Sequence, residues 1–249
     1  MNKPLLILII AALKEELKYL KSYVKNSKHV VYKDIQFFSG ILSSSKVLIV
    51  HSGVGMHKAA RATRSALDVA RPSYLILTGF CGATQKHLNV GDIVISEKII
   101  LRELSPISHG SSEKLIHIAR SLQCPLHIGT TVSSQNALAT PEEKLKLGIH
   151  TGALAINMEG HAVAQVANLA KIPFIEIRSV LDRVNDSLPD FSHDYFSWKK
   201  NKYVQRMEIQ LKMAHESLTP SLISFIEKTE QEYHLNIQTL PPDFRTSLP

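Results

Sequence analysis

Residues 153–182 read ALAINMEGHAVAQVANLAKIPFIEIRSVLD, and the architecture of the chain can be inferred from this run. An apolar segment at 153–157 precedes a segment with helical periodicity at 159–170, and a second apolar segment follows at 173–180. Short apolar segments that alternate with helical ones are typical of strands covered by helices on both faces. The run therefore predicts a strand, a helix and a second strand of an α/β protein.

The same alternation extends along most of the chain. Further buried strands are predicted at 4–11, 74–78, 90–100 and 125–132, and helices at 13–25, 56–70, 112–122 and 141–147. A hairpin is predicted from strands at 29–38 and 46–51, with Gly40 and the nearby serines as its turn. The strand at 74–78 is expected to stop at Gly79. Together these elements predict a single-domain, three-layer α/β/α fold with a central mixed, twisted sheet.

The length of 249 residues suits one large α/β domain. Residues 1–190 carry the alternating pattern and are expected to form its main part. From about Tyr195 the pattern is mostly helical, so residues 191–239 are expected to be a helical extension of the same domain. The last segment, 240–249, contains prolines and is expected to be a flexible tail.

The charge and cysteine content limit the possible partners and compartment. Lys and Arg exceed Asp and Glu by 29 − 22 = 7, but the densest basic stretch, 199–212, is interrupted by acidic and apolar residues. We therefore expect no nucleic-acid partner. The N-terminal apolar run at 5–13 is too short to span a membrane, and Cys81 and Cys124 provide no disulfide framework. A cytoplasmic protein without a membrane span is expected.

Three carboxylates follow predicted strands, where α/β proteins place their ligands. Asp182 follows the strand at 173–180, Glu159 follows the strand at 153–157, and Glu16 lies just after the first strand. Each has an ordinary structural alternative, since Asp forms turns and caps and Glu favours the first turn of a helix. Three such groups on one sheet nevertheless indicate a site.

Cofactor and metal motifs are not supported by the sequence. The segment Gly53-Val54-Gly55-Met56-His57-Lys58 begins like a dinucleotide fingerprint, but Lys58 stands where the third glycine belongs. The 12 histidines include no pair at metal-ligand spacing with a supporting carboxylate, and His161 is interpreted as a packed or solvated residue. We therefore expect neither a metal nor a cofactor.

Several motifs, taken in order, resemble one known family. Residues 155–164 (AINMEGHAVA), 172–174 (IPF) and 178–182 (RSVLD) are similar to the signature of the purine nucleoside phosphorylase and methylthioadenosine/S-adenosylhomocysteine nucleosidase superfamily. The opening segment 12–17 (ALKEEL) resembles the first strand-to-helix turn of the nucleosidases. Glycine-containing segments at 52–55, 78–83 and 90–94 follow in the family's order, and those at 139–141 and 151–154 are most similar to its hopanoid-associated phosphorylase-like branch. The resemblance spans about residues 4–190 and implies the nucleoside phosphorylase fold and a catalytic domain over 1–190.

The resemblance also implies roles for particular residues. Asp182 would protonate the purine at N7, Glu159 would bind the ribose hydroxyls with Met158 packed on the sugar, and Glu16 would orient the attacking water. Arg178 would help to hold that region. The central loop Gly79, Phe80, Cys81 and Gly82 and the adenine-binding segment Asn136, Ala137 and Leu138 would complete the substrate site. This chemistry needs a raised pKa at Asp182, which an apolar pocket provides, and an ionised Glu159.

The nucleophile and the exact substrate stay open at this point. Phosphorylases of this family have a glycine-rich first turn and an arginine before the central loop, whereas this chain has Ala11-Ala12-Leu13-Lys14 and Leu77. Water is therefore favoured over phosphate, although Lys14, Arg61 and Arg178 are alternative sources of charge for a phosphate co-substrate. Residues Phe80 and Leu181 and the altered segment at 133–138 depart from the nucleosidases.

Three hypotheses remain. The first is hydrolysis of an adenine nucleoside modified at the 5′ position, such as methylthioadenosine or S-adenosylhomocysteine. The second is phosphorolysis, including that of an adenosylhopane-type substrate, and the third is nucleoside binding without catalysis. By analogy with its relatives, the protein is expected to form a homo-oligomer, with a dimer favoured.

Overall fold

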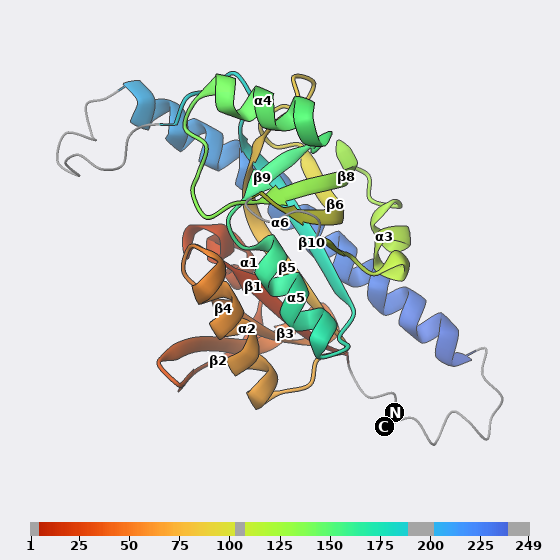
Figure 1. Cartoon of the computed structure of the whole chain (residues 1–249). Coiled ribbons are helices and arrows are strands. Elements are labelled where there is room, and N and C mark those ends of the chain that lie inside the picture. The colour runs from red at the N-terminus through yellow and green to blue at the C-terminus, as the bar shows by residue number, and fades with distance from the viewer. Residues whose placement is uncertain (1–4, 103–107, 189–201, 239–249) are drawn as a thin grey trace.

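The computed structural model describes residues 5–102, 108–188 and 202–238, which contain one mixed sheet with helices on both faces (Figure 1). Along the sheet the strands follow the order β10, β6, β8, β9, β5, β1, β4, β3, β2, and β7 pairs with β6. Their bounds are β1 Leu6–Ala11, β2 Lys25–Tyr32, β3 Ile35–Leu42, β4 Ser45–His51, β5 Tyr74–Ala83, β6 Ile93–Leu101, β7 Ser108–Gly110, β8 Leu126–Ser133, β9 Ala155–Asn157 and β10 Phe174–Asp182. The expected α/β/α fold with a central mixed sheet is confirmed.

Five of the strands close into a ring. β10 pairs with β5 in addition to β6, so β5, β9, β8, β6 and β10 form a closed series of neighbours. β10 runs parallel to β5 and antiparallel to β6, which makes the sheet mixed at this point. The central strand β1 lies between β5 and β4, parallel to both. The ring places the ends of β5, β9 and β10 close together.

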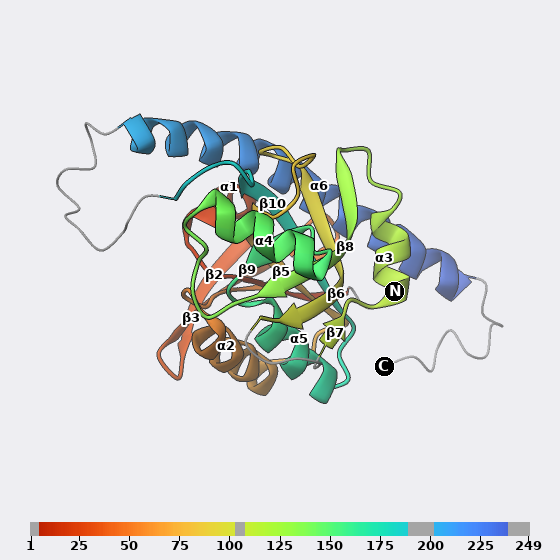
Figure 2. The same ribbon diagram turned by 45° about the horizontal axis from the view of Figure 1, so that its top comes forward.

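Two hydrophobic cores lie on opposite faces of the sheet. In β1, Ile7 and Ile9 belong to one core and Leu8 and Ile10 to the other, since neighbouring side chains of a strand point to opposite faces. The first core is covered by α1, α3 and α6, and the second by α2 and α5 (Figures 1 and 2). The helices are η1 Glu15–Leu17, α1 Lys18–Ser22, α2 Met56–Val69, α3 Glu113–Ala119, α4 Pro141–Thr151, α5 Gly160–Leu169 and α6 Lys202–Gln238.

The prediction for the hairpin region is wrong in its turns. Gly40 lies inside β3 instead of in a turn, and the strand predicted at 29–38 is interrupted by a turn at Lys33 and Asp34. Lys33, Asp34 and Ser43 take positive φ angles of 49°, 62° and 55°, so these residues form the two tight turns of a three-stranded meander. Gly40 serves a different purpose, since a Cβ there would collide with Val24 Cγ1 and come within 2.7 Å of the Lys25 carbonyl oxygen.

Two other predicted boundaries are also wrong. The helix expected at 13–25 is reduced to η1 and α1, because only about one turn packs on the sheet, through Leu17 and Leu20, and the chain enters β2 at Lys25. Strand β5 does not stop at Gly79 but continues to Ala83, because β10 pairs beside it as far as Gly82. The stretch expected to be a substrate loop is therefore a strand.

The C-terminal part of the chain adds one long helix. α6 packs against β10, α3 and α1, so it covers the face of the sheet that carries the first core. Residues 189–201, with the predicted helix start at Tyr195, and the predicted tail at 240–249 lie outside the described residues. In the described parts of the chain, no helix is both long enough and apolar enough to cross a membrane. The division at residues 190 and 239 stays a prediction.

The close approach at Gly40 leads to a stability prediction. Gly40→Ala is expected to lower the free energy of unfolding by about 1–3 kcal/mol, because the added methyl group overpacks the contact between β3 and the start of β2. Urea denaturation of this variant and of Ser39→Ala, a partly exposed neighbour on the same strand, would measure the effect. Equal unfolding midpoints for the two variants would contradict it.

Candidate active site

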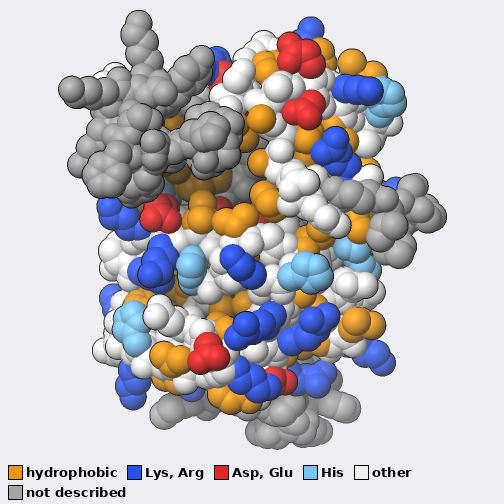
Figure 3. All heavy atoms as spheres, turned by 60° about the vertical axis from the view of Figure 1, so that its left-hand side comes forward, with side chains coloured by type: hydrophobic (Ala, Val, Ile, Leu, Met, Phe, Trp, Pro, Cys, Tyr) orange, Lys and Arg blue, Asp and Glu red, His pale blue; other side chains and the backbone are white. Residues whose placement is uncertain are grey.

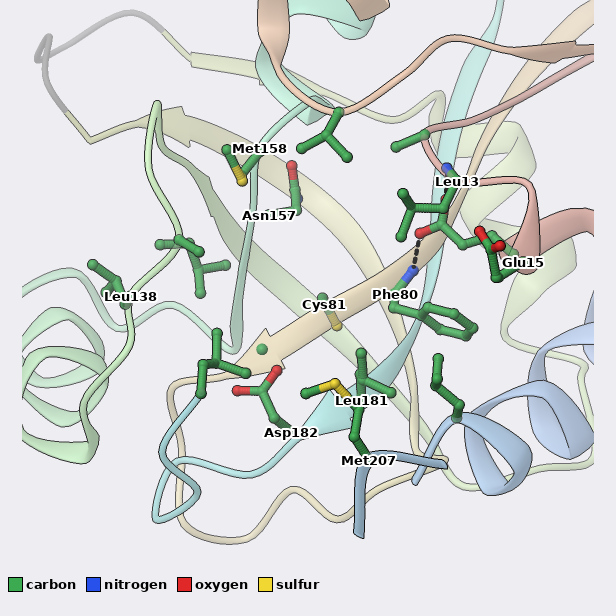
Figure 4. A pocket seen from close by; sticks show the side chains of 18 of the residues that line it. Leu13, Glu15, Phe80, Cys81, Leu138, Asn157, Met158, Leu181, Asp182 and Met207 are labelled. Carbon is green, nitrogen blue, oxygen red and sulfur yellow. Dashed lines mark hydrogen bonds between the residues drawn. The ribbon is translucent and has the colours of Figure 1, made fainter. Parts of the chain in front are cut away.

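A large cavity lies where β5, β9 and β10 end, and the three predicted carboxylates line it. Figure 4 shows Asp182 among the side chains of its wall. Its volume is about 770 Å³. Most of its wall is apolar, from Ala12, Leu13, Val54, Phe80, Cys81, Ala137, Leu138, Ile156, Met158, Leu181, Leu188, Met207 and Leu211. The charged residues of the wall are Glu15, Glu16, Lys144, Glu159, Asp182 and Glu208. A cavity with an apolar wall and a few converging polar groups is typical of a small-molecule site.

A β-bulge aims Asp182 into this cavity. Val180 pairs with Cys81 and Asp182 pairs with Gly82, so Leu181 is an extra residue in β10. In a regular strand two neighbours point to opposite faces, whereas here both Leu181 and Asp182 line the cavity. A Cβ on Gly82 would lie 3.0 Å from Asp182 Oδ2, so a glycine on the paired strand leaves room for the carboxylate.

Asp182 has a buried lysine as its partner. Lys144 of α4 is fully buried, and its Nζ lies 2.7 Å from Asp182 Oδ2. Burial raises the pKa of Asp182 above its usual range, and the Lys144 charge and hydrogen bond act in the opposite direction. The net shift is upward, in the direction that the sequence analysis requires of an acid, but a cation in contact with it was not expected.

Glu159 is held at the N-terminus of α5 by the residues around it. The Asn157 side chain accepts hydrogen bonds from the backbone N–H groups of Glu159 (3.0 Å) and Gly160 (2.8 Å), and so satisfies two donors where the helix begins. The Glu159 carboxylate accepts from the Gly55 N–H at 3.0 Å and from Arg178 Nη2 at 3.3 Å. These donors stabilise an ionised carboxylate at the edge of the cavity.

Glu16 is a buried carboxylate of the cavity wall. Its Oε2 accepts from the Leu13 N–H at 2.7 Å and its Oε1 from the Phe80 N–H at 2.8 Å (Figure 4). Burial raises the pKa of Glu16 to about 7, although Arg178 and the two backbone hydrogen bonds lower it. The approach is so close that a Cβ on Gly79, whose φ is +136°, would collide with the carboxylate.

Arg178 lies behind the cavity wall and connects residues from different parts of it. Its guanidinium donates to Glu176 Oε1 at 3.0 Å, to Glu159 Oε2 at 3.3 Å and to the Phe80 carbonyl oxygen at 3.2 Å. Burial alone would lower the pKa of Arg178. The three surrounding glutamates, Glu176, Glu159 and Glu16, raise this pKa by more than burial lowers it, so the group stays charged. The charge is therefore directed to carboxylates of the protein.

The predicted site residues are not all in the cavity wall. Phe80, Cys81, Gly82, Ala137, Leu138 and Met158 line it together with the three carboxylates. Gly79 and Arg178 lie behind the wall, where each contacts Glu16 or Glu159. Asn136 is exposed and absent from the wall, and its N–H donates to Ser134 Oγ at 3.3 Å, so its expected place in the substrate site is not supported.

Two residues that were alternative phosphate ligands line another cavity. Lys14 and Arg61 border a hollow of about 410 Å³ with Lys58 and His51, and they are not part of the main cavity. Leu77, where the phosphorylases of the family have an arginine, is fully buried in β5. Of the three candidate charges only Arg178 lies next to the main cavity, and its hydrogen bonds go to protein oxygens.

Cys81 and His161 are not assigned a chemical role in this cavity. Burial raises the pKa of the Cys81 thiol, so it stays protonated and is not an activated nucleophile. His161 is buried and its ring packs 4.7 Å from that of His109. Within the described residues, no group of three or more His, Cys, Asp or Glu side chains is placed to hold a metal ion. In Figure 3 the Lys and Arg side chains lie mostly in the lower half of the face, interspersed with histidines and hydrophobic residues.

Sequence reasoning missed Lys144 and the contribution of α6. Lys144 lies in a helix with charged neighbours, where a lysine is normally solvated; the only available signal is Gly148, one turn later, whose Cα packs on the Thr84 carbonyl. Met207 and Leu211 of α6 reach the cavity from a segment far away in sequence. His215 of the same helix packs against the Phe80 ring, with centroids 5.0 Å apart.

The fold is that of the nucleoside phosphorylases and nucleosidases. The chain belongs to the phosphorylase superfamily, whose family model matches residues 6–213. The 5′-methylthioadenosine/S-adenosylhomocysteine nucleosidase of Staphylococcus aureus is 29% identical over 196 residues, which are 71% of this chain and 86% of that protein.

Solved structures share the fold at lower sequence identity. The nucleosidase of Neisseria meningitidis, in complex with methylthio-immucillin-A, has a TM-score of 0.77 at 22% identity, covering 89% of this chain and 98% of that one. The futalosine hydrolase of Helicobacter pylori has a TM-score of 0.77 at 18% identity, covering 90% and 98%. The resemblance stated from the sequence motifs is therefore confirmed at the level of the superfamily and the fold.

The raised pKa of Glu16 leads to a pH-dependent stability prediction. The folded state binds the Glu16 proton more tightly than the unfolded chain does, so ionisation of Glu16 destabilises the folded state. This destabilisation is absent below pH 4.5 and complete above about pH 7. Glu16→Gln removes the ionisation. Its stability relative to the wild type is expected to rise between pH 4.5 and 7, by up to about 3 kcal/mol. Denaturant unfolding at pH 4.5, 6 and 8 would measure this, and parallel profiles would contradict it.

Proposed function

We propose that this protein is an enzyme that hydrolyses the N-glycosidic bond of an adenine nucleoside modified at the 5′ position. The observation that carries the proposal is the position of Glu16. Its carboxylate accepts hydrogen bonds from the N–H groups of Leu13, in the turn after β1, and Phe80, on β5. A carboxylate at this position repels an anion and occupies two N–H donors that a phosphate would need. It remains able to accept a proton from water.

The proposed reaction uses the three carboxylates in separate roles. Water attacks C1′ of the ribose and passes a proton to Glu16, whose pKa of about 7 suits a base at neutral pH. The bond between C1′ and the base nitrogen breaks, its electron pair moves onto the purine, and Asp182 protonates the purine. Glu159 accepts hydrogen bonds from the ribose hydroxyls and offsets the positive charge that develops on the sugar. The products are a free base and a sugar with a hemiacetal at C1′.

The wall of the cavity supports a substrate with an apolar 5′ substituent. Leu13, Val54, Leu181, Met207 and Leu211 leave little polar surface outside the carboxylates. This suits the thioether of methylthioadenosine, and S-adenosylhomocysteine is the second candidate by similarity to the relative from Staphylococcus aureus. An adenosylhopane-type nucleoside remains an alternative.

A product assay tests the proposal. The purified protein is incubated with methylthioadenosine, S-adenosylhomocysteine, adenosine and inosine, with and without phosphate, and the base and sugar products are identified. We expect adenine and the free sugar, at a rate that phosphate does not change. A sugar 1-phosphate formed only with phosphate would establish phosphorolysis instead. Nucleoside binding without turnover of any of the four would favour a non-catalytic binding protein.

A substitution at Asp182 tests the role of the acid. Asp182→Asn is expected to lower kcat by roughly two to four powers of ten with a smaller change in KM, because the protonation of the base occurs in the transition state. Asp68→Asn, an exposed carboxylate paired with Lys33, is the control and should leave both constants near those of the wild type. Wild-type turnover by Asp182→Asn would remove the residue from this role.

We further propose that the enzyme works without a cofactor, as a homo-oligomer in the cytoplasm, with a dimer favoured. The free thiols of Cys81 and Cys124 suit a reducing compartment. The proposed chemistry needs only water and protein carboxylates. Light scattering on the purified protein would give the oligomeric state, and retention of activity after dialysis against a chelator would test the absence of a metal.

A further inference from the structure

We propose that Lys144 and Asp182 share one proton and deliver it to the purine as a unit, with Lys144 acting through Asp182. This inference rests on the proposed function, since it concerns the source of the proton that the leaving base takes up. It assigns Lys144 as a positioning and proton-supplying residue. Asp182 remains the group that touches the base.

All three N–H bonds of the Lys144 ammonium have acceptors. Nζ donates to Asp182 Oδ2 at 2.7 Å, to the Arg183 carbonyl oxygen at 2.7 Å and to the Asp186 carbonyl oxygen at 2.5 Å. The side chain is fully buried yet belongs to the cavity wall. A buried ammonium is costly unless it is fully hydrogen-bonded, and here the three acceptors surround it.

The two carbonyl acceptors permit proton transfer without loss of their bonds. When Lys144 passes the proton along its contact with Asp182 Oδ2, a neutral amine remains, and its two other N–H bonds stay directed at the carbonyls of Arg183 and Asp186. The amine lone pair then faces the carboxyl group. Only one proton changes place, so the structure around the pair need not rearrange.

The proton step balances as follows. Before cleavage the pair is an ammonium and a carboxylate, with a net charge of zero. As the C1′–purine bond breaks and its electron pair moves onto the base, Asp182 takes the proton from Lys144 and passes it to the purine. The pair then carries a net charge of −1, as an amine and a carboxylate. The proton that water released to Glu16 leaves to solvent, and a solvent proton restores Lys144.

Other charged groups near the pair are already engaged with each other. The Asp186 carboxylate is bonded by Arg183, Arg206 and Gln210, so it presents its carbonyl and not its charge to Lys144. On α4, Glu143 is exposed and bonded to Thr140.

Across the cavity the pair faces further groups. Cys81 of β5 is a neutral thiol next to Asp182, and Glu208 of α6 lies in the wall. Glu16 and Glu159 belong to the other end of the site, where Arg178 offsets their charge. Lys144 is thus the group in direct ionic contact with Asp182.

Removal of Lys144 would leave Asp182 to hold the proton alone. Burial raises the pKa of this carboxyl, whereas Lys144 lowers it. A lone buried carboxylic acid loses its proton at a lower pH than a lysine ammonium does. The activity of the wild type should therefore persist further into the alkaline range than that of a variant without Lys144.

The test compares pH profiles of kcat with methylthioadenosine for the wild type, Lys144→Met and Lys146→Met. Lys146 is an exposed lysine on the same helix and serves as the matched control. For Lys144→Met we expect the alkaline limb to move down by at least about two pH units, since a carboxylic acid replaces an ammonium as the proton source. At pH 6 the variant should keep activity within roughly tenfold of the wild type, and at pH 9 it should fall roughly a further hundredfold. A loss of the same factor at every pH would overturn the proposal, because a purely structural role predicts that result.

A second measurement does not require turnover. Infrared titration, with Asp182→Asn as the subtraction reference, isolates the carboxyl band of Asp182. In the wild type we expect this carboxyl to be ionised at pH 7, and in Lys144→Met we expect it to be protonated there. A protonated Asp182 in the wild type at pH 7 would overturn the shared proton. If the infrared result holds while no nucleoside is cleaved, the proposed function fails, and not the pairing of Lys144 with Asp182.

Discussion

The buried guanidinium of Arg178 is the contact on which the rest of the site depends. It binds Glu176 on its own strand, Glu159 at the start of α5 and the carbonyl of Phe80 on β5. Glu176 in turn accepts hydrogen bonds from Ser96, Thr131 and Asn157, which lie on β6, β8 and β9. One polar network therefore joins all five strands of the ring. Removal of one partner from such a buried pair typically costs about 3–5 kcal/mol, since the other charge is left unpaired.

The network also separates the two ends of the cavity. Near Arg178 the carboxylates of Glu16 and Glu159 are held by backbone N–H groups and by the guanidinium, so the cavity can accommodate positive charge on a sugar. At the far end Asp182 lies next to Lys144, where a proton can be supplied to a base. Cleavage of a glycosidic bond needs both kinds of environment, one on each side of the bond that breaks. The bulge at Leu181 and the close contact at Gly79 are local features that keep these ends in place.

The part of this arrangement that follows from local patterns could be predicted. The apolar runs place Glu16 after the first strand without any long-range information. They place Glu159 and Asp182 after later strands in the same way. The failures arise where a contact distant in sequence overrides the local pattern. Gly40 reads as a turn residue but lies in β3 because it pairs with Val47 of β4, and the glycines after Thr78 read as a strand end but pair with β10.

The sequence by itself determined the alternation of strands and helices, the superfamily and the three carboxylates, because each depends on residue types at short spacing. The tertiary structure alone decided that Lys144 is the partner of Asp182, that Asn136 lies outside the cavity wall and that α6 supplies part of that wall. Those facts depend on segments that are brought together only when the ring closes and the helices pack on it. Apart from Gly148 one turn later, no local pattern distinguishes a buried lysine on α4 from a solvated one, since its burial is set by strands that lie elsewhere in the chain.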